Sequence, residues 1–298
     1  GKGRLTTIND PSGTRHYIYD AFGRITREEK TLEGLLFITA YGYDDAGNLT
    51  AVTYPSGRQI NYSRDVSGRV IDVETVMDNN TRTLAGQIQY LPFGPMTAMT
   101  YGNGLSLTRT FDRNYTPEQF NLANVLETGY EVDSVGNIVQ ISNHLNGLDQ
   151  MFDYNLKYEL TQASGSTGTL DYDYDPLGNR QSITHDDETF TYSYEPGTSI
   201  LNSVTGTNPV TMVHDANGCI TSRMVSGKHQ TFEYDPENRL TRFIENGATI
   251  SEYAYNSQWQ RVKKTVSGKT TLYHYDLSGS LIAETDASGR TLKEYIYL

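Results

Sequence analysis

A short motif recurs along the whole chain, and this repetition limits the possible folds more than any other feature of the sequence. The motif is Tyr-Asp, two variable residues and Gly, as in the segments that begin at Tyr19 and Tyr174. Aligned on the tyrosine position, which we call the anchor, the copies begin at residues 19, 43, 64, 90, 111, 132, 154, 174, 194, 214, 234, 255, 275 and 297. The mean spacing of about 21 residues is typical of stacked repeat architectures. We therefore expect one continuous array over residues 1–298, with about thirteen repeats.

Each copy of the motif predicts a β-hairpin. Aromatic residues at the anchor and two positions before it give the period-two alternation of a strand face. The Asp side chain can bond the backbone two residues on, and Gly supplies the positive φ that closes a type I turn with a bulge. A second strand follows and ends at a turn such as Asn246-Gly247 or Ser267-Gly268. Because no helical period is sustained anywhere, we predict an all-β protein whose tandem hairpins, about 26 strands, form a long antiparallel sheet that curls or spirals.

The positions that define the repeat are predicted to be structural. Gly stands four residues after the anchor in eight of the thirteen complete copies. The best-preserved copies supply the paired rings, the turn Asp and the turn Gly at Tyr17, Tyr19, Asp20, Gly23, Tyr43, Asp44, Gly47, Tyr172, Tyr174, Asp175, Gly178, Tyr234, Asp235, Tyr273, Tyr275, Asp276 and Gly279.

Several copies depart from this pattern. The Asp is replaced by Leu91, Asn155, Glu195 and Asn256, and the Gly by Tyr115, Tyr158, Thr198 and Trp259. We expect these turns to differ in length or type, which leaves the strand registers around residues 80–160 open. Asn238 also replaces Gly, and it fits the standard turn because Asn tolerates a positive φ.

The aromatic residues predict how the hairpins associate. Of the 33 aromatic residues, 22 fall at the anchor or two positions before it. If successive hairpins pair edge to edge, these two columns become ladders of rings about 4.8 Å apart, a spacing suited to offset stacking. The other face of the sheet would be polar. Such a strip has two hydrated faces, which explains a hydrophobic content of only 36%.

Composition excludes several classes of function. The net charge of -12 opposes binding to nucleic acid or to an anionic membrane, and we expect neither nucleic-acid binding nor membrane insertion by this segment. The single cysteine, Cys219, rules out a disulfide framework and a Cys-based zinc site.

The candidate chemistry is sparse. Asp171, Asp173 and Asp175 alternate along one predicted strand and form a weak candidate metal site, which we interpret instead as a solvated face and a turn Asp. The six histidines are spread singly, and His214 and His274, in or beside the ring columns, are expected to stack on rings. No G-x-S-x-G motif is present, so we expect no catalytic residue and no cofactor. Paired carboxylates for glycoside hydrolysis stay open as an alternative, because neighbouring strands can bring Asp and Glu together.

These many copies of one motif resemble the RHS or YD-repeat family, which includes bacterial Rhs proteins, the B and C components of Tc insecticidal toxins, and animal teneurins. The resemblance covers essentially the whole chain. It implies a β-strip that spirals into a hollow shell, and in the bacterial members this shell encloses a toxic C-terminal polypeptide. Cargo-releasing members also carry a self-cleavage motif, D-P-x-G-L. Here Asp175-Pro176-Leu177-Gly178 is followed by Asn179, and we interpret it as an ordinary turn.

The resemblance and the repeat together predict a non-catalytic structural role. We expect a segment of a longer shell with two open ends, whose partners are the adjoining repeats, an enclosed C-terminal polypeptide and, as a further possibility, a delivery-system protein. The implied location is secreted or at the surface of a bacterial cell. The alternative is a cell-surface adhesion or carbohydrate-binding module, in which exposed Tyr and Trp259 would contact sugars.

Overall fold

The computed structural model describes residues 3–297, and within them the protein is all-β, as predicted. The first fourteen strands are β1 (Thr7–Asp10), β2 (Gly13–Tyr19), β3 (Ile25–Leu32), β4 (Leu35–Tyr43), β5 (Leu49–Thr53), β6 (Gln59–Arg64), β7 (Val70–Met77), β8 (Asn80–Tyr90), β9 (Met96–Tyr101), β10 (Ser106–Phe111), β11 (Pro117–Leu122), β12 (Leu126–Val132), β13 (Ile138–Asn143) and β14 (Gln150–Tyr154). The remainder are β15 (Leu160–Gly165), β16 (Gly168–Tyr174), β17 (Arg180–His185), β18 (Glu188–Tyr194), β19 (Leu201–Thr205), β20 (Val210–His214), β21 (Ile220–Val225), β22 (Lys228–Tyr234), β23 (Leu240–Glu245), β24 (Ala248–Tyr255), β25 (Arg261–Val266), β26 (Lys269–Tyr275), β27 (Leu281–Asp286) and β28 (Thr291–Glu294).

The strands form one sheet in which each strand pairs antiparallel with the next along the chain. The sheet has 28 strands, two more than thirteen hairpins supply, because the partial copies at the two ends add β1 and β28. The predicted anchors are confirmed: every even-numbered strand from β2 to β26 ends at an anchor residue.

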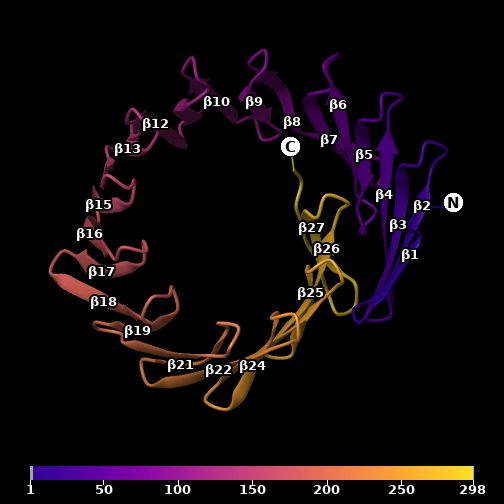
Figure 1. The fold of residues 1–298 in the computed structure, drawn as a ribbon. Coiled ribbons are helices and arrows are strands. Elements are labelled where there is room, and N and C mark those ends of the chain that lie inside the picture. The colour runs from indigo at the N-terminus through magenta and orange to yellow at the C-terminus, as the bar shows by residue number, and fades with distance from the viewer. Residues whose placement is uncertain (1–2, 298) are drawn as a thin grey trace.

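The sheet bends into one nearly complete turn (Figure 1). The C-terminal strands β25–β27 lie inside the N-terminal strands β2–β4, so the strip overlaps itself as a spiral does. Side chains bury most completely in the overlap and in the adjoining strands up to β10, where Ile60, Val73 and Leu107 are each at most 1% exposed. Leu32 and Phe37 of the outer layer form one cluster with Val262 and Leu272 of the inner layer. In contrast, no hydrophobic side chain described between Leu107 and Val262 is fully buried.

Polar contacts also join the two layers of the overlap. Lys30 donates from Nζ to the carbonyl oxygen of Tyr273 at 3.2 Å, and Lys263 pairs with Glu33 at 2.8 Å. The Phe37 ring lies 4.2 Å from the ring of His274, centre to centre. The single-layer part of the sheet has no such second layer, so its stability depends on contacts between neighbouring hairpins.

No helix in the described part of the chain offers a length and hydrophobicity that could carry it across a membrane.

Candidate functional surface: the concave aromatic face

Most anchors are followed by the predicted type I turn and bulge, although Gly94, after Tyr90, lacks the positive φ. At Asp175, the Gly178 N–H donates to the Asp175 carbonyl at 3.0 Å, and the Asp175 N–H donates to the Asn179 carbonyl at 2.8 Å. Gly178 has φ of 83°, and the register shifts by one residue at Tyr174. The Asp175 carboxylate also accepts the N–H groups of Leu177 and Asn179, both at 2.9 Å. The segment that resembles part of a D-P-x-G-L motif is thus an ordinary turn.

The residue after the turn Gly completes this arrangement, which the sequence analysis missed. Asn48 donates its side-chain amide and its backbone N–H to Asp44 at 2.9 and 2.8 Å, and these bonds lower the pKa of Asp44. Arg24, Arg69 and Arg239 bind their turn Asp in the same way. Arg or Asn recurs at this position in the sequence, and that recurrence was the available signal.

The prediction of different turns in the degenerate copies is wrong for three of them. Tyr115, Tyr158 and Trp259 adopt φ of 65°, 64° and 63°, and their N–H groups close the same turns as Gly does elsewhere. Asn238 also fits the standard turn, as expected, with φ of 61°. Bulky residues are tolerated because these turns lie at the surface, where Tyr115, Tyr158 and Trp259 are 44%, 61% and 63% exposed.

Two degenerate copies do differ. The turn after Tyr194 is one residue longer, since Glu195 donates its N–H to Ile200 rather than to residue 199. The pairing of β8 with β9 shifts register at Gly86 and Gln89. Part of the region around residues 80–160, whose registers the sequence did not determine, is therefore irregular.

The prediction that the rings of the anchor column stack on one another is wrong. The described ring pairs are Phe37–His274 and Phe232–Phe243, and neither joins two anchors. The reason is geometric: each hairpin contributes one anchor, so consecutive anchors lie two strands apart, at about 9.6 Å rather than 4.8 Å. His274 does lie against an aromatic ring, that of Phe37, but the two rings are tilted by 49° and are not stacked.

Instead, each anchor tyrosine bonds the strand that lies between it and the preceding anchor. The Tyr174 hydroxyl donates to the Leu160 carbonyl at 2.8 Å, and Tyr194 donates to Arg180 at 2.9 Å. All ten tyrosine anchors make this bond, to the sixth residue after the preceding anchor or its equivalent: Tyr19, Tyr43, Tyr90, Tyr154, Tyr174, Tyr194, Tyr234, Tyr255, Tyr275 and Tyr297. Burial raises the pKa of Tyr174, so its hydroxyl stays a donor. This ladder explains why Tyr predominates over Phe at the anchor.

Arginine side chains cover many of the rings. The Arg180 guanidinium lies 4.4 Å from the centre of the Tyr192 ring, and Arg24 lies 4.9 Å from Tyr43. A guanidinium over an aromatic face contributes about 0.5–2 kcal/mol, depending on its exposure. The rings are thus held by hydroxyl bonds and cations rather than by one another.

The anchor face is the concave face of the sheet. In the outer layer of the overlap, Phe37 lies on the same face of β4 as Tyr41 and Tyr43, and it contacts His274 of the inner layer. His274 therefore points outward, and its neighbours Tyr273 and Tyr275 point inward. Because the sheet is continuous, the anchors line the concave side throughout.

The two faces differ in chemistry over the single-layer part, β10 to β24. Cross-strand partners share a face, so the register assigns each side chain to one side. The concave face carries half-buried rings and aliphatic groups, such as Phe152, Leu170, Tyr172, Ile183, Tyr192, Val204, Phe232 and Phe243. The convex face carries polar groups, such as Asp153, Asp171, Asp173, Ser182, Thr184, Ser193, Ser203 and Glu233, with Met151, Val213 and Met224 as apolar exceptions. The predicted division into a ring-lined face and a polar face is confirmed.

On the convex face, the residue seven positions after the anchor is aliphatic and buried where the overlap covers it. The seventh residue after the anchor is Thr in six copies, including Thr161, Thr221 and Thr241, and the hydroxyl of Thr241 bonds the Glu233 carbonyl at 3.0 Å. In the covered copies that position is Val262 or Ile282, and each is at most 2% exposed. Burial also lowers the pKa of His274 to about 3, with a further contribution from the positive charge of Lys30.

The weak candidate metal site is not assembled. Asp171 and Asp173 lie side by side on β16 and are exposed, where they accept hydrogen bonds from Gln162 at 2.7 Å and Ser182 at 3.0 Å. Asp175 lies beyond the bulge and binds its own turn. Within residues 3–297, no three His, Cys, Asp or Glu side chains are grouped so that they could hold a metal ion. Cys219 is a half-buried free thiol.

These observations define a class of protein: a repeat protein whose YD hairpins form one curved, single-layer sheet with a polar outside and an aromatic inside. The family profile described as Teneurin YD-shell matches residues 86–297, and the profile described as RHS Repeat matches residues 1–34 and 43–81. The chain therefore belongs to the Teneurin YD-shell family, with RHS repeats at its N-terminal side.

Individual proteins of known sequence or structure are also similar to this chain. The chain is 32% identical over 143 residues to the tRNA nuclease WapA of Bacillus subtilis strain 168, an alignment that covers 47% of this chain and 6% of WapA. It resembles the crystal structure of TcdB2-TccC3 without its hypervariable C-terminal region, with a TM-score of 0.61 and 13% identity over 99% of this chain and 20% of that one. It also resembles the Tc holotoxin pore of Photorhabdus luminescens, with a TM-score of 0.59, 14% identity and the same coverage. The chain thus spans about a fifth of the Tc shell chains and a far smaller share of WapA.

Proposed function

We propose that this chain is a non-catalytic stretch of a shell wall that encloses a C-terminal toxin or effector polypeptide of a longer protein. The observation that carries the proposal is the difference between the two faces of a single-layer sheet. From β10 to β24 the concave face is aromatic and aliphatic, and nothing in residues 3–297 covers it. An extended apolar surface marks a place where another polypeptide is held. The polar convex face suits contact with water.

Family membership and the Tc shell fold support this role. WapA is named a tRNA nuclease, but this chain matches only 6% of it. We propose that any catalytic activity of the whole protein lies outside residues 1–298, because the described residues hold their carboxylates in turns and on a solvated face rather than in a cleft. The proposed partners are the adjoining repeats, the enclosed polypeptide and a delivery-system protein, and the proposed location is secreted or at a bacterial cell surface.

The test uses the whole protein as its gene encodes it. Electron microscopy is expected to show a hollow particle, and the C-terminal region is expected to resist a protease that digests it rapidly once it is separated from the repeats. A solid particle, or a C-terminal region cut equally fast in both samples, would refute enclosure.

The alternative, an adhesion or carbohydrate-binding module, requires rings on an outward surface. The rings of the columns lie on the concave face instead, which disfavours it. Trp259 is 63% exposed at a turn and is the best candidate for a sugar contact. Glycan-array binding that is lost in Trp259→Ala would favour this alternative over enclosure.

A further inference from the structure

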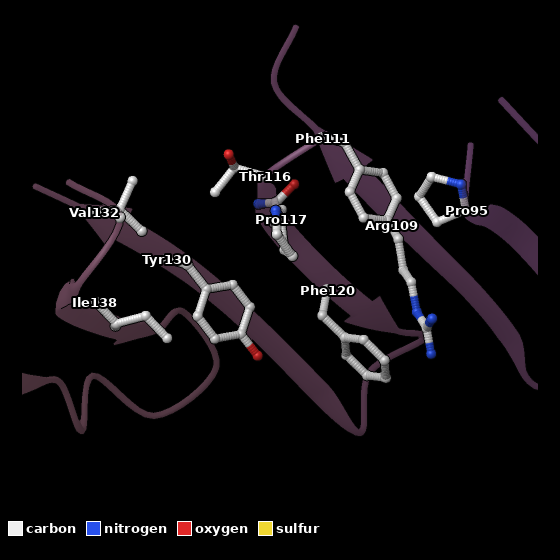
Figure 2. A pocket seen from close by; sticks show the side chains of 11 residues that line it. Pro95, Arg109, Phe111, Thr116, Pro117, Phe120, Tyr130, Val132 and Ile138 are labelled. Carbon is white, nitrogen blue, oxygen red and sulfur yellow. The ribbon is translucent and has the colours of Figure 1, made fainter. Parts of the chain in front are cut away.

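An apolar hollow opens on the concave face between β10 and β13 (Figure 2). It has a volume of about 410 Å³, within the range of sites that hold a small molecule or a few side chains. Its walls are formed by three aromatic rings, two aliphatic side chains and one cation: Phe111, Phe120, Tyr130, Val132, Ile138 and Arg109. We call it the Arg109 pocket.

Arg109 occupies a position that is aromatic in most copies of the repeat. It stands two residues before the anchor Phe111, in the column that carries Tyr or Phe in eleven of the fourteen copies. Its guanidinium lies 5.3 Å from the centre of the Phe120 ring. Because an arginine replaces a ring here, the concave face gains a positive charge inside an otherwise apolar hollow.

No acidic partner for this charge is present in residues 3–297. Arg15, Arg24 and Arg58 each pair with a carboxylate, whereas Arg109 makes no ion pair among the described side chains. Its Nε atom is buried and has no hydrogen-bond partner. A buried donor without an acceptor is costly, and the cost is removed when a ligand supplies the acceptor.

We propose that the Arg109 pocket binds an acidic side chain flanked by apolar residues, presented by the enclosed polypeptide. This inference rests on the proposed function. A carboxylate would accept paired hydrogen bonds from the guanidinium, and the adjoining apolar side chain would fill the space between the rings. The pocket opens on the face that carries the enclosed polypeptide, and the apolar surface continues from it over Phe152 and Tyr172, so a longer segment can follow the sheet.

The test is photo-cross-linking in the whole protein. Phe111→p-benzoylphenylalanine places the reactive ketone at the wall of the pocket, and Thr110→p-benzoylphenylalanine, on the same strand and the opposite face, is the matched control. We expect residue 111 to cross-link to a C-terminal peptide that contains Asp or Glu next to an apolar residue, and residue 110 to give no such product. In the residue 111 background, Arg109→Gln should lower the yield about tenfold, and Arg109→Lys should restore part of it.

The outcomes separate this proposal from enclosure itself. Protease resistance of the C-terminal region is measured on the same samples. Resistance without a cross-link at residue 111, or with one that is unchanged in Arg109→Gln, overturns the pocket and leaves enclosure standing. Loss of resistance in the unmodified protein overturns enclosure. A cross-link to a second copy of the chain, or to a peptide without Asp or Glu, also overturns the pocket as proposed.

Discussion

Replacing Gly178 by Val tests whether the positive φ of the turn is what the repeat requires. Gly178 has φ of 83°, which a β-branched residue adopts at a cost of about 1–3 kcal/mol. Space adds little to this cost, because a Cβ at residue 178 would first meet the flexible end of Glu159, at 3.3 Å. At about 2 kcal/mol, the equilibrium for opening the hairpin of β16 and β17 should rise about thirtyfold.

Hydrogen exchange measures this opening locally, which matters because a repeat array can open one hairpin without unfolding globally. The amide groups of Asp175 and Gly178, which close the turn, should exchange about thirtyfold faster in Gly178→Val, and those of distant hairpins should not change. Gly178→Asn is the matched control, since Asn238 adopts this conformation natively. Unchanged exchange in the Val variant would refute the turn assignment. Equal acceleration in the Asn variant would show that the side chain, rather than φ, causes the effect.

Three further predictions address the anchor ladder and the overlap. Tyr174→Phe removes one hydroxyl bond and should lower the free energy of unfolding of its hairpin by about 0.5–1.5 kcal/mol, measured by hydrogen exchange; no change would show that the ladder does not stabilise the sheet. His274 has a pKa lowered to about 3, so its contribution is complete above pH 6.5 and is lost as the pH falls from 6.5 toward 3, by up to about 1.4 kcal/mol per pH unit. Denaturant melts should therefore depend less on pH in His274→Gln than in the unmodified protein. Val262→Thr replaces a buried methyl group by a hydroxyl in the overlap and should cost about 0.5–2 kcal/mol, clearly more than the converse change Thr241→Val on the uncovered face; equal costs would contradict the overlap.

The repeat made most of the local structure predictable. Thirteen of the fourteen anchors lie at the end of a strand, and the Asp-to-Gly turns after Tyr19, Tyr234 and Tyr275 have the expected bulge, because these features depend on residues within one hairpin. Two predictions were wrong because they extended a local sequence pattern without the geometry of the neighbouring strands. Tyr115, Tyr158 and Trp259 close the standard turn, since the path of the flanking strands imposes a positive φ on these three residues. The anchor rings do not stack, because the strand that separates them was left out of the expected spacing.

The candidate surface was less predictable than the fold. The alternation of rings and polar residues indicated two unlike faces, but not which of them is concave. The Arg109 pocket requires residues from β10 to β13 to converge, and its one charged member replaces a ring that the pattern had assigned to structure.

The sequence alone determined the hairpin, its period and the chemistry of each face, because these follow from side-chain alternation and turn residues within about 21 positions. Only the tertiary structure decided that the strip closes on itself, with Phe37 against His274 and Val262 buried under the outer layer. The curvature that produces this overlap is the sum of small rotations at every strand pair. The sequence of one repeat does not show the total curvature. The strands that meet at the overlap are more than 200 residues apart, and only the three-dimensional structure identified them.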